Sequence, residues 1–446
     1  MSVLYFYGLR LCRLNAYLLL LLSTLVAPKV DAEPEITNGL RDKTLSLPNV
    51  TAAVLANDLT LSRLGLEANA FTAEAEASSY LPDPVLFGGL QNLPSDTFDL
   101  DQEPMTQFRF GIRQMLPKGD SLEINQKMST ISTGMQGLKQ QIRRSKLKKA
   151  SELAWLEAWY WQKKLELIAE DRVFLVQVLD FVQSLYEVGS RPQSDVLGAQ
   201  LELIKLDESR IEAEQKYHLY RSELNTLANS VLEGSLLNPD LYLFSSSLAR
   251  KLRPTELADI LTLHPELQLL DAQISMSEQR QSMTEQNFEP TWGLEVAYGL
   301  RTGEDMTGNS RSDFLSAGVS VSLPLFTDGK QKSELNAAKF RNASIENQRL
   351  ETLQKIRFQL ESMQQQVSIT QQQRTLYEQE FLPKLAEQKQ SAVRSYESDS
   401  GNFGIVTELF RKEQSAKTKH QRLRVKEQIL LSAINYWLAE QGDEAQ

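Results

Sequence analysis

The sequence predicts a mostly helical fold with a membrane β-barrel portion, in which each protomer contributes four strands and long coiled-coil helices to a shared assembly. Three observations lead to this fold class. An export signal is followed by no apolar helix of membrane-spanning length, very long helical segments alternate with short amphipathic strands, and the second half of the chain repeats the first. A repeat on this scale indicates a tandem duplication of one supersecondary unit.

The N-terminus is typical of an export signal. Arg10 and Arg13 precede an apolar run over residues 16–27, and residues 30–32 supply small side chains around a cleavage position. The apolar run is too short to remain as a membrane-spanning anchor. We therefore expect residues 1–32 to be a signal peptide that is removed on export.

Composition narrows the class of the mature protein. The formal net charge is -10 with 24% charged residues, and such an acidic chain has no general affinity for nucleic acid. The only cysteine, Cys12, would leave with the signal peptide, so no disulfide, thiolate metal site or lipid anchor is expected. No run of about 18 apolar residues follows Ala32. The chain is therefore either a soluble periplasmic protein or one that crosses a membrane by strands.

Four long segments are rich in Ala, Leu, Glu, Gln, Lys and Arg and predict helices. They run from about Ser121 to Glu187, from about Gln193 to Leu232, from about Gln331 to Tyr396, and from Phe403 to about Leu438. At 1.5 Å per residue the first and third would each be on the order of 100 Å long. Such lengths are typical of coiled coils and helical tubes. Pro383 predicts a kink or break in the third helix.

The apolar positions of the long helices repeat every seven residues. Ile168, Leu175 and Val182 form one such row, and Leu353, Leu360 and Val367 form another. A seven-residue repeat keeps one seam facing a partner helix. The seam is thin and interrupted by Gln, Ser and Thr, which fits helices with one side on partner helices and another on water.

Short segments between the helices alternate with a period of two. Residues 292–300 and 314–323 alternate large apolar side chains with small or polar ones, which predicts strands with one apolar face. Each is about as long as a tilted strand that crosses a bilayer. A weaker copy of the pattern covers residues 108–116, and its partner is expected at residues 85–90.

Landmarks recur along the chain at a nearly constant offset. The segments at 111–117 and 318–324 match at an offset of 207, Pro82 and Pro290 at 208, and Tyr186-Glu187 and Tyr396-Glu397 at 210. We predict a first structural repeat over residues 33–240 and a second over residues 241–446, each with a helix, two strands and a long helical hairpin. Four membrane-length strands cannot close a barrel alone, because open edges in lipid leave backbone groups unpaired. The strands must then be pooled among copies, although the sequence pattern does not set the number of copies.

Several short motifs, in order and spacing, resemble the TolC-type outer-membrane efflux protein family over nearly all of the mature chain. They are Leu81-Pro82-Asp83-Pro84, Gln114-Met115-Leu116-Pro117-Lys118-Gly119, Val188-Gly189-Ser190-Arg191 with Asp195-Val196-Leu197 and Ala199-Gln200 following, His264-Pro265-Glu266-Leu267, Phe288-Glu289-Pro290-Thr291-Trp292, and Ser322-Leu323-Pro324-Leu325-Phe326. The chain departs from the family near its start, where the helix expected from about Val50 to Ser79 is low in apolar residues.

The resemblance implies a homotrimer with twelve strands in one outer-membrane barrel and twelve helices in one periplasmic tunnel. It further implies a passive exit duct that receives substrates from an inner-membrane pump and a periplasmic adaptor (a membrane fusion protein). Metal cations or drugs moved by a resistance-nodulation-division pump are the candidate substrates. The alternatives are a soluble periplasmic coiled-coil adaptor or scaffold, and the outer-membrane channel of a type I protein secretion system. An adaptor would not need four bilayer-length strands.

The turns that end the two long hairpins carry most of the candidate site residues. The resemblance implies adaptor docking at Val188, Gly189, Ser190, Arg191, Asp195 and Gly401. It also implies a periplasmic gate, for which the candidates are Tyr186, Arg191, Tyr396, Glu397 and Asp399. Turn chemistry alone accounts for the glycines, and solvated helix-end charges account equally well for the carboxylates.

The strand alternation assigns two faces. Trp292, Leu294, Tyr298, Leu315, Val319 and Val321 should face lipid or a neighbouring element, and the expected pore-facing residues are Glu295, Ser316, Ser320 and Ser322. The inverse arrangement would place a carboxylate in hydrocarbon at a cost of several kcal/mol. The sequence contains no HExxH, GxSxG or P-loop motif, and its three histidines are far apart. We expect no enzyme activity, no cofactor and no resident metal.

Overall fold

The computed structural model describes residues 44–239, 244, 254–398 and 401–438. Up to residue 236 the elements are β1 (Thr44–Leu45), α2 (Leu47–Ala56), α3 (Leu59–Ala77), β2 (Val85–Gln91), β3 (Gln107–Leu116), α4 (Ser121–Glu187), α5 (Gln193–Ala228) and β4 (Ser235–Leu236). From residue 254 they are α6 (Pro254–Thr262), α7 (Pro265–Glu285), the 3₁₀ turn η4 (Gln286–Phe288), β5 (Thr291–Leu300), β6 (Phe314–Ser322), α8 (Lys330–Leu376), the π-helical turn η5 (Tyr377–Phe381), α9 (Leu382–Glu397) and α10 (Phe403–Leu438). The predicted signal peptide and the predicted repeat boundary at 240 and 241 lie outside the described residues.

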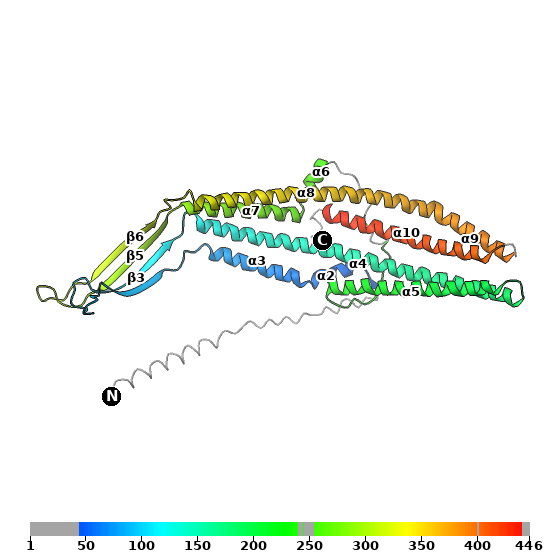
Figure 1. Ribbon diagram of the computed structural model, residues 1–446, viewed down its shortest axis with the longest axis horizontal. Helices are drawn as coiled ribbons and strands as arrows, with labels where there is room; N and C mark the ends of the chain where they lie inside the picture. Colours follow the sequence, from blue (N-terminus) through cyan, green and yellow to red (C-terminus); the bar gives the residue numbers. More distant parts are fainter. Residues whose placement is uncertain (1–43, 240–243, 245–253, 399–400, 439–446) are drawn as a thin grey trace, which may run out of the picture. The chain divides into compact units, whose positions relative to one another are not determined.

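The long helices run side by side, with the strands preceding one end of α4 and of α8 (Figure 1). Helix α4 packs against α3, α5, α7 and α10, and α8 packs against α7 and α10. The order of helix, two strands, long helix and returning helix therefore occurs twice along the chain. Helix α4 has both predicted ends and α10 has the predicted start, whereas α5 stops at Ala228, where Asn229 takes up a left-handed conformation with φ 48°.

The third predicted helix is interrupted just before Pro383. Helix α8 ends at Leu376, and η5 follows as a π-helical turn in which the Leu382 N–H donates to the Tyr377 carbonyl. Proline has no N–H and its ring crowds the carbonyl of the preceding turn. A π-helical turn widens the backbone locally and so lets the helix continue as α9 through the proline. The predicted interruption is found here as a bulge within a continuing helix.

The helix expected from about Val50 to Ser79 is two helices, α2 and α3, and this part of the prediction was wrong. Asn57 ends α2, and the Asp58 carboxylate then accepts a hydrogen bond of 2.8 Å from the Leu61 N–H at the start of α3. An aspartate in this position satisfies an otherwise unpaired N–H of the first helical turn. Neither Asn57 nor Asp58 is a glycine or proline, so the apolar pattern did not reveal the break.

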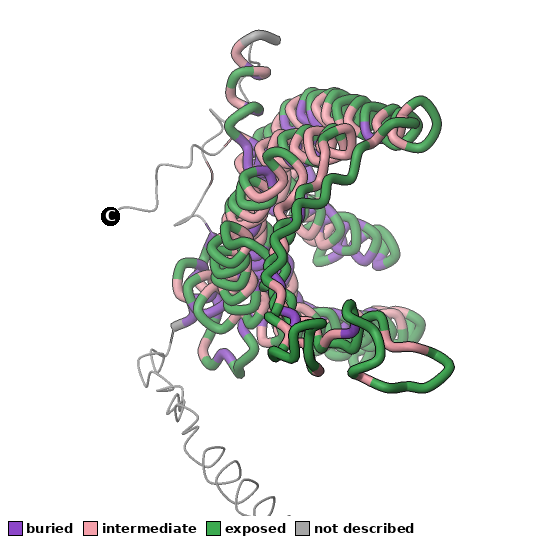
Figure 2. Tube along the Cα trace, turned by 90° about the vertical axis from the view of Figure 1, so that its left-hand side faces the viewer, coloured by how far each residue is buried: buried purple, intermediate pink, exposed green. Residues whose placement is uncertain are grey.

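The largest apolar cluster joins α2, α4 and α5. Trp155 and Trp159 of α4 are 0% and 1% exposed, and Val50 and Val54 of α2 are both 0% exposed. Leu224 of α5 completes the contact from the other side. Figure 2 shows buried residues along the helices, while the loops are mostly exposed. Helix α2 therefore packs firmly on α4 despite its small number of large apolar residues.

The four predicted strands form one antiparallel sheet in the order β2-β3-β5-β6. Register pairs Gly111 with Phe87 on one side and with Ala297 on the other, and Glu295 with Gly318. Strands β2 and β6 are the edges, and neither has a second partner among the described residues. A separate pair, β1 and β4, lies parallel. The sheet is thus open within one chain.

Candidate functional site

One face of the sheet is almost entirely apolar. Its side chains alternate with those of the other face along every strand, and each of the following is at least 39% exposed: Leu86, Leu90, Phe108, Phe110, Ile112, Trp292, Leu294, Val296, Tyr298, Leu300, Leu315, Val319 and Val321. A soluble monomer rarely exposes so continuous an apolar surface. The apolar positions predicted from alternation all lie on this face.

Aromatic side chains lie toward both ends of the apolar face. Trp292 is paired with Leu116 at the end nearest the helices, whereas Phe110 and Tyr298 lie near the loops with their ring centroids 5.8 Å apart. Aromatic side chains at both ends of an apolar band are typical of strands that cross a bilayer. Strand β3 has 10 residues. At the usual rise of about 3.3 Å per residue, it is about 33 Å long, close to the hydrocarbon thickness of a bilayer.

The opposite face carries mostly small and polar side chains, and Val85, Phe87 and Met115 are among its larger apolar residues. Glu295 lies on it, and register places Ser316, Ser320 and Ser322 on the same face. The Ser320 hydroxyl is 3.4 Å from the Gly293 carbonyl. The structure thus brings the four predicted polar residues together on the side of the sheet opposite the apolar face.

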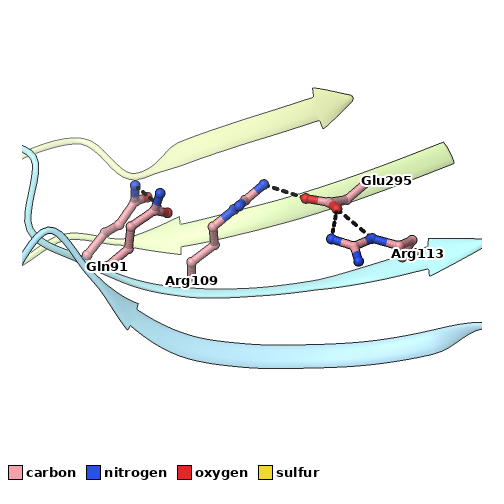
Figure 3. Close-up of polar contacts among 5 residues, drawn as sticks. Gln91, Arg109, Arg113 and Glu295 are labelled. Atoms are coloured by element: carbon pink, nitrogen blue, oxygen red, sulfur yellow. Dashed lines mark hydrogen bonds and ion pairs between the residues drawn. The ribbon is translucent and has the colours of Figure 1, made fainter. Parts of the chain in front are cut away.

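Two arginines that the alternation did not single out for a role bind Glu295 on this face. The Arg109 Nη2 donates to Oε1 at 2.5 Å, and the Arg113 Nε and Nη2 both donate to Oε2 at 2.9 and 2.6 Å. Figure 3 shows the carboxylate lying between the two guanidinium groups. Both guanidinium groups also lie over the ring of Phe87, at 5.5 and 5.4 Å from its centroid.

The turns at the other end of α4 and of α9 are linked to each other by Arg191. Its Nη1 donates to the Gly401 carbonyl at 3.2 Å and its Nη2 to the Tyr396 carbonyl at 2.9 Å. The guanidinium group also lies 4.3 Å from the centroid of the Tyr396 ring. One side chain from the α4–α5 turn therefore donates to one backbone carbonyl in the last turn of α9 and to another in the loop between α9 and α10.

Tyr396 adds a second link between the two hairpins. Its side chain is 3% exposed and packs against Phe403, and its hydroxyl donates to Asp195 Oδ2 of α5 at 3.0 Å. A tyrosine buried in this way places its ring in an apolar cluster and its hydroxyl on a carboxylate. Asp195, predicted from the sequence as a docking residue, is thus part of the same linked group as Arg191 and Tyr396.

Other predicted tip residues lie apart from this link. Tyr186 is 43% and Val188 76% exposed, and Ser190 and Glu397 are exposed as well. Asp399 lies outside the described residues. The structure therefore separates the gate candidates into a linked group and a set of solvent-facing side chains at the turns.

The two predicted tip glycines have different structural roles. Gly189 has φ +75°, a left-handed conformation that ends α4 and that side chains with a Cβ rarely adopt. A Cβ on Gly401 would lie 2.6 Å from the Tyr396 backbone N, so the chain can pass this close only without a side chain. Gly189 shapes a turn, whereas Gly401 permits the approach that Arg191 bridges.

Within the described residues, no helix is both long and apolar enough to cross a membrane. In the same part of the chain, no group of three or more His, Cys, Asp or Glu side chains is arranged to hold a metal ion.

No family model matches the sequence, and a comparison with curated proteins finds no match. Among solved structures, the chain is similar to CusC with a TM-score of 0.72 and 15% identity, covering 88% of this chain and 91% of that one. It is similar to the outer membrane protein VceC of Vibrio cholerae with a TM-score of 0.70 and 14% identity, covering 88% and 95%. For the open-state MtrE outer membrane channel of Neisseria gonorrhoeae the TM-score is 0.70, the identity 13%, and 88% of each chain is covered.

These likenesses establish the fold. The described chain shares the protomer fold of solved outer-membrane channels, with long helices and one four-stranded sheet. The predicted fold class is confirmed for the protomer, and the family resemblance drawn from short motifs is confirmed at the level of the fold.

Proposed function

We propose that this chain is one protomer of a homotrimeric outer-membrane channel, the exit duct of a tripartite efflux system. The channel lies in the outer membrane with its helical tunnel in the periplasm. It carries out no reaction: substrates enter from an inner-membrane pump and a periplasmic adaptor and leave through the pore formed by the strands.

The two-faced sheet carries this proposal. Its apolar face is exposed, its other face is mostly small and polar, and both edge strands lack a second partner in the described chain. Unpaired strand edges in lipid cost several kcal/mol for each unsatisfied backbone group. Pairing β6 of one copy with β2 of the next removes both edges and places the polar face inside a closed barrel. The apolar face then contacts lipid.

Unpartnered apolar stripes on the helices support the same assembly. Along α5, the exposed apolar side chains are Leu197, Leu201, Ile204, Ile211 and Leu219, each at least 50% exposed. Along α8 they are Phe340, Leu350, Phe358, Ile369 and Leu376, each at least 46% exposed. The α5 residues are 4, 3, 7 and 8 apart, and Phe358, Ile369 and Leu376 of α8 are 11 and 7 apart, which are spacings that place side chains on one helix face. We propose that neighbouring copies cover these stripes, and that three copies close the tunnel.

The hairpin turns are the proposed contact with the adaptor and the proposed gate. The residues proposed to contact the adaptor are Val188, Gly189, Ser190, Arg191, Asp195 and Gly401. The residues proposed to form the gate are the linked pair Arg191 and Tyr396, together with Tyr186, Glu397 and Asp399. The observed bonds from Arg191 to two carbonyls tie the second hairpin to the first. Breaking them would free the end of α9 to move away from α5.

The test is the oligomeric mass of the protein extracted from outer membranes in detergent, with the detergent contribution subtracted. The proposal predicts a mass of three chains in the outer-membrane fraction. A soluble periplasmic monomer or dimer would contradict it and would favour the adaptor or scaffold function. A Leu294→Arg variant tests the assembly further, because it alters only the apolar face and should shift protein from the trimer peak to aggregates.

A further inference from the structure

We propose that the sheet face around Phe87 is an anion-attracting site, which makes the part of the pore formed by the strands favour anions over cations. The inference rests on the proposed function, because it takes the polar face of the sheet to line the pore. It concerns the charge of the species that pass, a property that the strand alternation leaves open.

The charges on the strands are few and all lie on one face. Among β2, β3, β5 and β6 the only Asp, Glu, Lys or Arg residues are Arg109, Arg113 and Glu295. Register pairs Arg113 with Glu295, and Arg109 lies two pleats along the same face. Each chain therefore presents one net positive charge to this face, and a ring of three copies presents three.

The accessible part of this group is positive. A guanidinium group has five N–H donors; Arg109 gives one to Glu295 and Arg113 gives two. The side chains of Arg109 and Arg113 are 32% and 50% exposed, whereas that of Glu295 is 18% exposed. An ion in the pore thus meets guanidinium groups more readily than the carboxylate. Arginine forks also match carboxylate and phosphate oxygens in geometry.

Phe87 and the glycines around it hold the arginines in place and leave space beside them. The ring of Phe87 lies over Gly111, where a Cβ would come within 2.7 Å of the ring atom Cζ. Both guanidinium groups lie over the same ring, a contact that favours a cation near its face. Gly89 and Gly318, on the same sheet face, have no atom within 4 Å of an added Cβ position. No bulky side chain at these positions covers the charges.

A ring of fixed charge on a low-dielectric wall raises the local concentration of the opposite ion. The effect decays within about 10 Å at 0.1 M salt, so low salt gives the larger signal. The loops at 92–106 and 301–313 carry seven carboxylates and only two arginines. Because the net charge of these loops is negative, they oppose the effect of the positive strand site. The contribution of the strand site is therefore measured with variants that change only the charges of that site.

The experiment measures the chloride-to-potassium permeability ratio of the purified channel in planar bilayers across a KCl gradient at low salt. The variants change the charge of the site in single steps: Glu295→Gln raises it, Arg113→Gln makes it neutral, and Arg109→Gln with Arg113→Gln makes it negative. Each step should change the ratio about twofold, in the order of the charge. A triple variant, R109Q/R113Q/E295Q, is also neutral and should match Arg113→Gln although its cross-strand bonds differ.

The outcomes separate the site from the channel. Ratios that follow charge, with R109K/R113K equal to the unmodified protein, support an anion-attracting site. Channels that conduct but keep one ratio through the whole series overturn the inference and leave Arg109 and Arg113 as clips between strands, with the proposed function intact. An absence of conductance, in trimers or without them, overturns the proposed function and this inference together.

Discussion

Apolar side chains are buried in the helical core but exposed on one face of the strand sheet. In the cluster around α2, α4 and α5, Trp155 and Trp159 are buried by the chain itself. In the sheet, Leu294 and Val319 are 46% and 66% exposed although they belong to regular, paired strands. The helices can therefore be stabilised largely within one chain, whereas under the proposed function the sheet is stabilised by lipid and by neighbouring copies. The same contrast separates changes that unfold the protomer from changes that prevent its assembly.

The largest effect is expected in the core. Trp159→Ala removes a fully buried ring and leaves a cavity, which typically costs about 3–5 kcal/mol. The free energy of unfolding, followed by helical circular dichroism in urea, should fall by this amount. Leu294→Ala is the comparison, because its side chain has no protein core to leave. The free energy of unfolding should fall by no more than about 1 kcal/mol in this variant. An equal fall in both variants would contradict the difference between the buried core and the exposed sheet face.

A charge on the apolar face comes next. Leu294→Arg should cost about 2–4 kcal/mol for an arginine placed in lipid. Trimer yield from outer membranes should drop, while the helices of the extracted protein keep their circular dichroism. Ser316→Arg on the other face of the sheet is the matched control and should assemble normally. Equal loss from both variants would mean that the two faces do not differ in their surroundings.

Asp171 of α4 predicts a dependence of stability on pH. Burial raises its pKa to about 6, and its Oδ2 has no hydrogen-bond partner in the structure. Lys389, Glu413 and Lys417 face it from α9 and α10, with Glu170 beside it. Because the folded pKa is raised, the stabilisation is complete below about pH 4 and is lost as the pH rises to about 6.

The variant Asp171→Asn keeps the group neutral at all pH values. At pH 8 it should stabilise the protein by about 2 kcal/mol relative to the unmodified chain, and near pH 4 the two should unfold alike. Urea unfolding at both pH values measures the difference. Asp207→Asn, at an exposed position paired with Arg172 on the surface, serves as the control. A gain at pH 8 in the control of the same size would argue against burial as the cause.

At the tip, Tyr396→Phe removes the hydroxyl that bonds Asp195 and keeps the ring in its cluster. Loss of this bond should cost about 1 kcal/mol. Channels with the substitution should open more often in planar bilayers, because the two hairpins lose one link. Tyr186→Phe, at an exposed position with no role in the link, should leave opening unchanged. If both variants open as often as the unmodified channel, the bond between Tyr396 and Asp195 has no role in gating.

The smallest effect is expected at a surface ion pair. Glu123 and Lys127 are paired at 2.6 Å on one face of α4, with both side chains more than half exposed. Such pairs contribute about 0.3 kcal/mol. Glu123→Gln should therefore leave urea unfolding nearly unchanged, and a loss above 1 kcal/mol would show that this part of α4 is buried in the assembly.

Sequence patterns predicted the parts of the fold that local chemistry determines. The ends of α4, the start of α10 and all four strands follow from turn residues and alternation. The break at Asn57-Asp58 was missed because capping by an aspartate leaves no mark in the apolar pattern. The bond from Arg109 to Glu295 joins residues 186 apart in the sequence. Alternation placed both side chains on polar faces, but only strand pairing shows that they meet.

The tip shows the same limit. Arg191 and Tyr396 were gate candidates on the family resemblance, and the structure does bring them into contact. Tyr186 occupies the matching position in the first half, yet it is exposed. These two tyrosines differ in exposure because only Tyr396 is covered by the neighbouring hairpin.

The central claim is that β6 of one copy pairs with β2 of the next and closes a ring of three. The most direct measurement is disulfide formation between these edges, in a chain whose Cys12 is replaced by serine. Gly89→Cys on β2 is combined in turn with Ser316→Cys, Gly318→Cys or Ser320→Cys on β6, since paired Cα atoms must lie about 4.4–6.8 Å apart. The account predicts that at least one pair oxidises to a covalent product of three chains and nothing larger. No product between chains with any pair, or an open ladder of longer products, would contradict the closed trimeric barrel.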